Sequence, residues 1–455
     1  MLFCSYIFIL LFLPVTLTGY FLLGRRNVTA ARLWLWGASL VFYGYFNWIY
    51  LLILIASLVV NFGIGRLLFA RRSKMALFAG ILFNILLIGY FKYYDFFVWN
   101  INFVFGSSFA LKHILLPLGI SFYTFQQIAY LLDIYHGVLK ERRSPLIYAL
   151  FISFFPQLIA GPIVLATELM PQFEDRSRYR VNYRNVACGI FVFALGLGKK
   201  ILLADHFAVA ADALFAGGAP GAGALVWGAL SYMFQIYFDF SGYCDMAIGI
   251  GTMFNIELPV NFRSPYRAAD IREFWRTWHI TLGRFLSQFV YFPLGGSRRG
   301  HVRTLFNLML TFLVSGIWHG AGWTFVLWGL IHGAAMALHR IWSDALQLRM
   351  PRWAGVVLTF VFVCAAWILF RAESIGDALR IYAGAAKFSA SGLKVSWNDI
   401  LYMAGAFFII FLLPPANSFV RKFRPCPAAW IAAMALLVLS LFGMTKSTPF
   451  IYFNF

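Results

Sequence analysis

Apolar stretches long enough to cross a membrane recur from one end of this 455-residue chain to the other. Hydrophobic residues make up 62% of the chain and charged residues 12%, a balance that is too apolar for a soluble globular protein. Within lipid, the backbone polar groups of such stretches must bond to one another, and helices achieve this within a single segment. The sequence therefore predicts an all-α, polytopic membrane protein.

The apolar runs differ in length, and this limits how many of them can be complete spans. They lie near residues 2–23, 33–47, 49–68, 76–98, 113–133, 146–166, 186–204, 222–238, 304–319, 323–342, 353–371, 398–415 and 428–445. The first run has no basic region before it and no small-residue cleavage site, so we expect a span and not a signal peptide. Because a bilayer core needs about 20 helical residues, we expect about 11 true spans, with the shorter runs forming re-entrant or interfacial helices.

The net charge of +20 is placed where a membrane protein needs it. Basic residues concentrate in short breaks between apolar runs, at residues 25–26, 66–74, 140–143, 176–184, 298–303 and 421–424. This distribution is typical of cytoplasmic loops under the positive-inside rule. The excess charge therefore indicates membrane topology and does not indicate binding to nucleic acid.

A polar and aromatic region interrupts the apolar pattern between Tyr237 and Gly296. It contains Asp239, Asp245, five arginines and His279 among aromatic side chains. Such a region is too polar to face lipid and too aromatic for a solvated loop. Irregular backbone at membrane depth is tolerated only where protein or a water-filled cavity surrounds it. We therefore expect irregular backbone inside the protein, beside a cavity.

Residues 268–285 are predicted to form one helix within this region, with Asp270 as its cap. On that helix Arg272, Arg276 and His279 would share one face, together with Trp275. One interpretation is a membrane-surface helix whose arginines meet lipid phosphates. The other is a site in which the arginines hold a phosphate-bearing donor. In that site His279, kept neutral by the nearby cations, lines the path of the donor.

A second histidine, His319, lies in the stretch Gly316–Trp323, deep inside an apolar and aromatic run. An ionisable group at that depth loses hydration and requires a partner or a function. The neighbouring Gly316, Gly320 and Gly322 would let another helix or a substrate approach the backbone. The alternative interpretation is a core histidine that bonds to a neighbouring carbonyl.

The sequence gives little support for other kinds of catalytic, metal-binding or disulfide site. The remaining histidines lie at helix ends, in loops, or on the helix that follows His319, where His332 and His339 are expected to be packing or interfacial residues. The five cysteines show no paired spacing, and we expect neither a disulfide framework nor a metal site. The sequence also contains no P-loop, no dinucleotide-binding fingerprint and no Gly-x-Ser-x-Gly motif. Histidine-assisted acyl transfer and a proton-coupled transporter or flippase remain.

Seven short motifs are spread along the chain. They are Phe274-Trp275-Arg276-Thr277-Trp278-His279, Gly316-Ile317-Trp318-His319-Gly320-Ala321-Gly322-Trp323, Leu116-Pro117-Leu118-Gly119-Ile120-Ser121-Phe122, Phe155-Pro156-Gln157-Leu158-Ile159-Ala160-Gly161-Pro162, Tyr237-Phe238-Asp239-Phe240-Ser241-Gly242-Tyr243, Asn261-Phe262-Arg263-Ser264-Pro265-Tyr266 and Phe292-Pro293-Leu294-Gly295-Gly296. Together they resemble the membrane-bound O-acyltransferase family, and most closely its bacterial branch that contains the alginate O-acetylation membrane subunit. The resemblance covers essentially the whole chain.

This resemblance implies a single domain over residues 1–455, in which a ring of helices surrounds a funnel. His319 matches the nearly invariant family histidine and His279 the second polar position. Acetyl-CoA would be the cytoplasmic donor, and no metal is expected. The phosphates of acetyl-CoA would lie near Arg272 and Arg276, and Arg298 is a further candidate for contacting them. The remaining substrate-binding candidates are Asn261, Trp275 and Trp318.

In this branch the acyl group is exported to modify a polysaccharide of the cell envelope. The resemblance therefore implies O-acetylation of an alginate-like polymer, with cellulose or peptidoglycan as alternatives. It also implies a multi-pass protein of the bacterial inner membrane, in contact with lipid. A periplasmic partner with an SGNH-hydrolase-like site would complete the transfer.

The chain ends Pro449-Phe450-Ile451-Tyr452-Phe453-Asn454-Phe455. An aromatic belt at the membrane interface is one interpretation of this segment. However, Phe-x-Tyr-x-x-Phe at a terminus is similar to the acyl-carrying tail of the teichoic acid D-alanylation system. We therefore expect residues 446–455 to form an extracytoplasmic tail with Tyr452 as a transient acyl acceptor.

Overall fold

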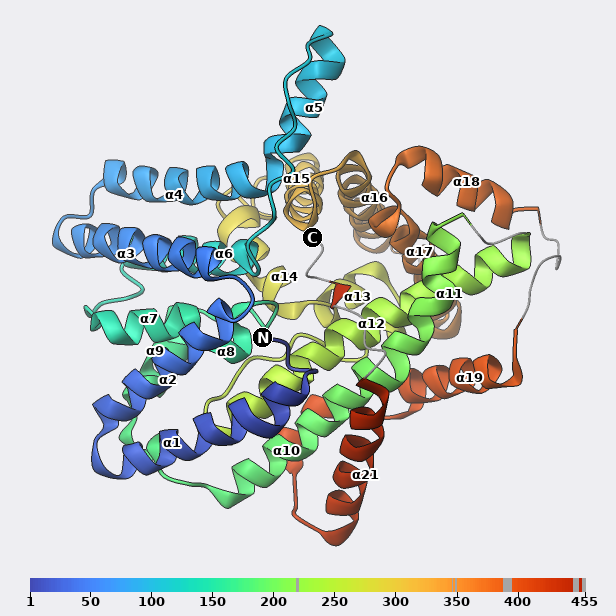
Figure 1. Cartoon of the computed structure of the whole chain (residues 1–455). Helices are drawn as coiled ribbons and strands as arrows, with labels where there is room; N and C mark the ends of the chain where they lie inside the picture. The colour runs from blue at the N-terminus through green and yellow to red at the C-terminus, as the bar shows by residue number, and fades with distance from the viewer. Residues whose placement is uncertain (218–220, 346, 348–349, 388–394, 445–449, 452–455) are drawn as a thin grey trace. The chain divides into compact units, whose positions relative to one another are not determined.

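The computed structural model describes residues 1–217, 221–345, 347, 350–387, 395–444 and 450–451 (Figure 1). Within these ranges the chain consists of helices and their connections, without a strand, so the predicted all-α class is confirmed there. The helices belong to two compact units. The first comprises residues 1–197, 243–259 and 419–444, and the second comprises the described residues of 198–242, 260–418 and 445–455.

The first unit contains most of the N-terminal helices. Its elements are η1 (Phe8–Phe12), α1 (Leu13–Arg26), α2 (Val28–Gly44), α3 (Trp48–Ala70), α4 (Lys74–Ile88), η2 (Gly89–Tyr93), α5 (Tyr94–Phe105), α6 (Ile120–Tyr135), α7 (Pro145–Ser153), α8 (Phe155–Leu158), α9 (Ala166–Glu174), η3 (Arg176–Tyr179), α10 (Tyr183–Gly198), α20 (Phe419–Lys422) and α21 (Pro427–Gly443). Helices α3, α4 and α6 pack together around buried amides. Asn84 donates to Asn61 at 2.6 Å, and Asn61 donates to Gln127 at 2.8 Å. Such bonds join helices where the surroundings are apolar.

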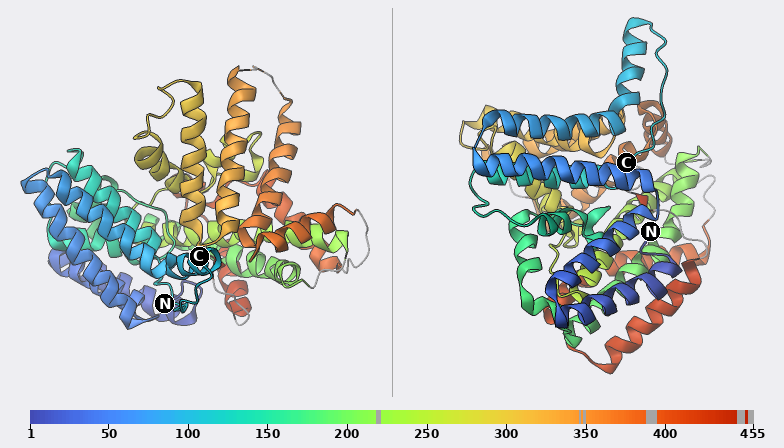
Figure 2. Two further views of the ribbon diagram at one scale, coloured as in Figure 1. Left: turned by 90° about the horizontal axis from the view of Figure 1, so that it is seen from above. Right: turned by 60° about the vertical axis from the view of Figure 1, so that its left-hand side comes forward.

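The second unit carries the motifs that stand out in the sequence. Its elements are η4 (Lys199–Ala204), α11 (Asp205–Phe215), η5 (Pro265–Arg267), α13 (Ile271–Thr277), α14 (Ile280–Leu286), η6 (Ser287–Tyr291), α15 (His301–His319), α16 (Trp323–Arg340), η7 (Ile341–Ala345), α17 (Arg352–Arg371), α18 (Ile375–Ala385), α19 (Trp397–Leu412) and η8 (Ala416–Ser418). Helix α12 (Ala222–Met253) contributes residues to both units. Helices α15, α16 and α17 form a row, which the left view of Figure 2 shows clearly.

Glycines allow α15 and α16 to approach closely. A Cβ at Gly316 would collide with the carbonyl oxygen of Phe325, and one at Gly320 would collide with the Phe325 ring. At Gly322 a Cβ would meet that ring at 3.6 Å, which is ordinary contact. The predicted close approach is thus confirmed at Gly316 and Gly320, whereas Gly322 is not required for it.

Five helical segments of the described chain are long and apolar enough to cross a membrane. They are Phe8–Arg26, Trp48–Ala70, Lys74–Phe105, Tyr183–Phe215 and Arg352–Arg371, and the shorter Trp397–Leu412 and Pro427–Gly443 are also apolar. Helices α12, α15 and α16 have 18 residues or more but are less apolar. These helices are compatible with a multi-pass membrane protein, and the number of about 11 spans stays a prediction.

Two backbone expectations for the region between Tyr237 and Gly296 are wrong. Helix α12 continues to Met253, so irregular backbone starts well after Tyr237. Residues 268–285 do not form one helix, because α13 ends at Thr277 and α14 starts at Ile280. The expected burial is confirmed, since nearly every side chain of α12 from Ala229 onward is buried.

Candidate functional site

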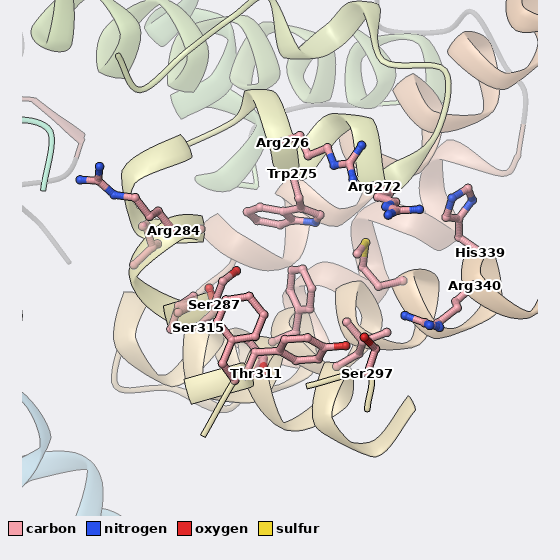
Figure 3. Close-up of a pocket in the computed structure, with 18 of the residues that line it drawn as sticks. Arg272, Trp275, Arg276, Arg284, Ser287, Ser297, Thr311, Ser315, His339 and Arg340 are labelled. Carbon is pink, nitrogen blue, oxygen red and sulfur yellow. The ribbon is translucent and has the colours of Figure 1, made fainter. Parts of the chain in front are cut away.

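A cavity of about 570 Å³ opens among α13, α14, η6, α15 and α16 in the second unit (Figure 3). Its volume falls in the range of about 300–1,000 Å³ that is usual for sites of small ligands. The lining residues are Arg272, Trp275, Arg276, Ile280, Leu282, Gly283, Arg284, Leu286, Ser287, Tyr291, Phe292, Ser297, Leu308, Thr311, Phe312, Ser315, Met336, His339, Arg340 and Ser343. The cavity lies beside the polar and aromatic region, as the sequence predicts.

Four arginines give this cavity its charge. Arg272 and Arg276 come from α13, Arg284 from α14 and Arg340 from the end of α16. In Figure 3, His339 and Arg340 lie with Arg272 and Arg276 on one side of the Trp275 ring, and Arg284 lies on the other. None of the described residues that line the cavity is acidic. Guanidinium groups in such surroundings are suited to bind phosphate oxygens.

The start of α13 is fixed by the acidic residues that precede and follow it. The Asp270 side chain accepts a hydrogen bond from the Glu273 N–H at 2.7 Å, so the predicted cap is confirmed. Glu273 in turn accepts from the Ala269 N–H at 2.7 Å. Because the helix starts here, Arg272 and Arg276 are one turn apart and both reach the cavity.

His279 lies at the break between α13 and α14, and it does not share a face with the two arginines. Its φ of 44° is in the left-handed region, which costs a residue with a side chain about 1–2 kcal/mol. The ring is 1% exposed and packs against Phe240, with ring centroids 4.9 Å apart. Burial lowers the pKa of His279 to about 3, so the imidazole is neutral.

Asn261 holds the backbone on the far side of this break. Its side-chain oxygen accepts from the Thr281 N–H at 3.1 Å and from the Thr281 hydroxyl at 2.7 Å. Its carbonyl oxygen accepts from the Ile280 N–H at 3.0 Å. Asn261 is fully buried and does not line the cavity. Its contacts therefore fix the first turn of α14, directly after His279.

His319 is the last residue of α15 and is 3% exposed. Aromatic rings enclose it: its centroid lies 4.9 Å from Trp318, 5.2 Å from Trp328 and 5.1 Å from Phe370. The carbonyl end of a helix favours positive charge nearby. The position is therefore suited to an imidazole that accepts a proton for part of a reaction.

Trp318 and Trp328 connect the two histidines and the cavity. The Trp318 ring lies 6.1 Å from His279 and 4.9 Å from His319. The Trp328 ring lies 5.2 Å from His319 and 5.7 Å from Trp275, which lines the cavity. Neither His279 nor His319 lines the cavity, and the aromatic layer of Trp318 and Trp328 contacts them.

Sequence reasoning missed several residues of this site. Arg284 is one of the five arginines of the polar region, and Arg340 ends the helix that follows His319, but neither is a candidate from the sequence alone. His339, which the sequence predicts to be a packing or interfacial residue, lines the cavity. His332 is buried as expected, and its Nδ1 accepts a hydrogen bond from the Trp275 indole at 3.3 Å. The basic end of the run 323–342 was the available signal for Arg340.

Two other expectations concern residues away from the cavity. Tyr452, the expected acyl acceptor, lies outside the described residues, and of the tail 446–455 only Phe450 and Ile451 are described. Arg298 follows the lining residue Ser297 but does not itself line the cavity. Among the described residues, no group of three or more His, Cys, Asp and Glu side chains could hold a metal ion.

Comparison with known proteins agrees with the motifs. Residues 138–375, just over half of the chain, match the model of the membrane-bound O-acyltransferase family. The chain is 41% identical to the peptidoglycan O-acetyltransferase of Helicobacter pylori, over 100% of this chain and 98% of that protein. It is 36% identical to the "Probable alginate O-acetylase AlgI" of Pseudomonas putida, over 100% of both. It is also 26% identical to the teichoic acid D-alanyltransferase of Bacillus subtilis, over 56% of this chain and 68% of that protein.

Proposed function

Because this chain belongs to the membrane-bound O-acyltransferase family, we propose that it moves an acetyl group from cytoplasmic acetyl-CoA across the membrane for O-acetylation of an envelope or exported polysaccharide. Two of the similar proteins are named for O-acetylation, of peptidoglycan and of alginate. An alginate-like polymer is the acceptor we favour, with peptidoglycan or cellulose as alternatives. The protein is an acyltransferase with several apolar helices, and we place it in the bacterial inner membrane.

The arginine-lined cavity is the observation that most directly supports the donor half of this proposal. Coenzyme A carries a diphosphate and a further phosphate, and guanidinium groups bind such oxygens in pairs of hydrogen bonds. Arg272, Arg276, Arg284 and Arg340 all line the cavity. Trp275 forms part of the wall beside them and offers a flat apolar surface. The donor phosphates bind at these arginines, and the thioester end extends toward the aromatic layer.

His319 is the general base in this proposal. It takes the proton from the acceptor hydroxyl while the hydroxyl oxygen bonds to the acetyl carbonyl carbon. The carbon–sulfur bond breaks, and the thiolate recovers the proton from His319, which leaves free coenzyme A and an acetyl ester. His279 stays neutral and orients the thioester carbonyl or the acceptor. Because the thioester is already activated, positioning supplies most of the rate enhancement.

Tyr452 is the first acceptor in this scheme. The basic residues 421–424 precede the last apolar helix, so the positive-inside rule puts the C-terminal tail on the extracytoplasmic side. A phenol with an ordinary pKa near 10 becomes a nucleophile when a base removes its proton. The acetyl group then passes from Tyr452 to a periplasmic partner with an SGNH-hydrolase-like site, and that partner acetylates the polymer.

Purified protein in detergent with acetyl-labelled acetyl-CoA tests this proposal. We expect release of free coenzyme A and transfer of the label to the protein. A transporter would instead move its substrate without cleaving the thioester. Absence of thioester cleavage by a well-folded protein, with its acceptor present, would overturn the proposed function.

A further inference from the structure

A buried cluster of charges lies in the second unit, apart from the cavity. Lys200 belongs to η4, and its ammonium lies 2.7 Å from Asp239 Oδ1 and 2.9 Å from Asp205 Oδ1. The Lys200 and Asp239 side chains are 1% and 2% exposed, and that of Asp205 is 10% exposed. Lys200 and Asp205 fall within the segment Tyr183–Phe215, which is long and apolar enough to cross a membrane. Charges at such depth are costly and call for a function.

The C-terminal part of the chain reaches this cluster. The Ile451 N–H donates a hydrogen bond of 2.9 Å to Oδ2 of Asp239, whose Oδ1 lies 2.7 Å from the Lys200 ammonium. The Phe450 ring lies with its centroid 4.9 Å from the Lys200 ammonium. Phe450 is 1% exposed and Ile451 is 7% exposed. Two adjacent residues of the tail thus contact both charges of one buried ion pair.

The charges of the cluster explain why it would bind a peptide segment. One ammonium faces two aspartate side chains in a buried place. A buried carboxylate requires hydrogen-bond donors, and the Ile451 N–H supplies one. The ammonium is attracted to the face of an aromatic ring, and Phe450 supplies that face. The cluster therefore recognises an aromatic residue followed by a free backbone N–H.

We propose that Lys200, Asp205 and Asp239 form an intramolecular binding site for the C-terminal segment Phe450–Ile451. The next residue in the chain is Tyr452. Under the proposed function, on which this second step rests, anchoring Phe450 and Ile451 positions the Tyr452 hydroxyl for acyl transfer. Lys200 and Asp239 are then positioning residues, which act on the reaction through the tail.

Amide hydrogen exchange at Ile451, measured by mass spectrometry on the full chain in detergent, tests the binding site. In the native protein we expect this amide to exchange slowly, because it donates to a buried carboxylate. Asp239→Asn removes the charge and should accelerate the exchange by about tenfold. Asp245→Asn is the matched control, since Asp245 is equally buried six residues further along α12. It should leave the exchange at Ile451 unchanged.

Phe450→Ala keeps the test valid if Asp239→Asn does not fold. This change lies in the tail and leaves the buried charges in place, yet it removes the ring beside Lys200 and should also accelerate exchange at Ile451. Polymer acetylation is measured on the same variants. Faster exchange with lower acetylation supports both steps. Faster exchange with normal acetylation supports the binding site and overturns its role in positioning Tyr452, whereas unchanged exchange in both variants overturns the binding site.

Discussion

Ser315 lines the arginine-rich cavity, and His319 follows it by four residues, about one turn further along α15. The two side chains therefore share one face of the helix. His319 itself does not line the cavity, but its helix turn directly follows the turn that does. Under the proposed function, this relationship puts the general base one turn away from the wall of the donor cavity.

His319→Gln should keep the fold and lose the activity. Glutamine has a similar length and can form hydrogen bonds, but it cannot accept a proton at neutral pH. Loss of a general base usually lowers the rate by about 10²–10⁴-fold. The measurement is release of coenzyme A by protein that elutes as a single species in detergent. Activity close to that of the native protein would exclude His319 as the base.

Replacing the cavity arginines by alanine should weaken donor binding more than it slows the chemical step. For Arg272→Ala, Arg276→Ala, Arg284→Ala and Arg340→Ala, we expect KM for acetyl-CoA to rise by about tenfold with a smaller change in kcat. The phosphate contact exists in both the ground state and the transition state, so its loss acts on binding. Arg303→Ala is the control, because Arg303 lies on α15 but does not line the cavity. A collapse of kcat at constant KM would place these arginines in the chemical step instead.

Gly316→Ala should destabilise the pair of helices that carries His319. The added methyl group would collide with the carbonyl oxygen of Phe325, which is backbone and cannot rotate away. Overpacking of this kind costs about 1–3 kcal/mol. Thermal unfolding in detergent should show a lower Tm, whereas Gly322→Ala, where the methyl group has room, should differ little from the native protein. Equal Tm values for the two variants would contradict the close approach of α15 and α16.

Two substitutions of His279 should separate the role of its backbone conformation from the role of its ring. Asparagine tolerates the left-handed region, so His279→Asn should keep the backbone of this break and yet lose most of the activity. Valine is β-branched and does not tolerate this region, so His279→Val should be less stable than His279→Asn. Thermal unfolding and activity, measured on the same samples, separate the two effects. Normal activity of His279→Asn would show that the ring serves only packing.

The buried imidazole of His279 should make the stability of the protein depend on pH. Burial holds the folded-state pKa of His279 near 3, below its ordinary value of 6.5. Below pH 6.5 the unfolded state therefore binds a proton that the folded state does not, and stability falls as the pH is lowered toward 3. Between pH 6.5 and pH 5 this amounts to about 2 kcal/mol. The His279→Asn variant lacks the group and should lose less stability over that interval.

The sequence predicts the helical fold and part of the site, because both depend on local spacing. Apolar runs of sufficient length form helices wherever they lie. Arg272, Trp275 and Arg276 fall within one short helix, so their i, i+3 and i+4 spacing is enough to put them on one side. The Asp270 cap is equally local.

The sequence pattern does not predict which helices and loops contact one another. His279 does not lie on the expected helix face, because Asn261 accepts hydrogen bonds from the Ile280 and Thr281 N–H groups and fixes the backbone there. The periodicity of the sequence does not predict this contact. Arg284 and Arg340 join the cavity from two further helices. Their side chains look like ordinary helix-end cations until tertiary structure brings them together.

Tyr452→Phe is the most selective test of the acceptor. The change keeps the aromatic ring and removes only the hydroxyl group, so folding and insertion should match those of the native protein. Polymer acetylation in cells should be lost, because phenylalanine has no oxygen with which to form the ester. With the native tail and no periplasmic partner, intact-mass analysis should find one acetyl group on Tyr452. His319→Gln should lack this adduct, because the phenol then keeps its proton and remains a poor nucleophile. If Tyr452→Phe acetylates the polymer normally, the tail is an interfacial anchor and the acetyl group passes directly to the partner.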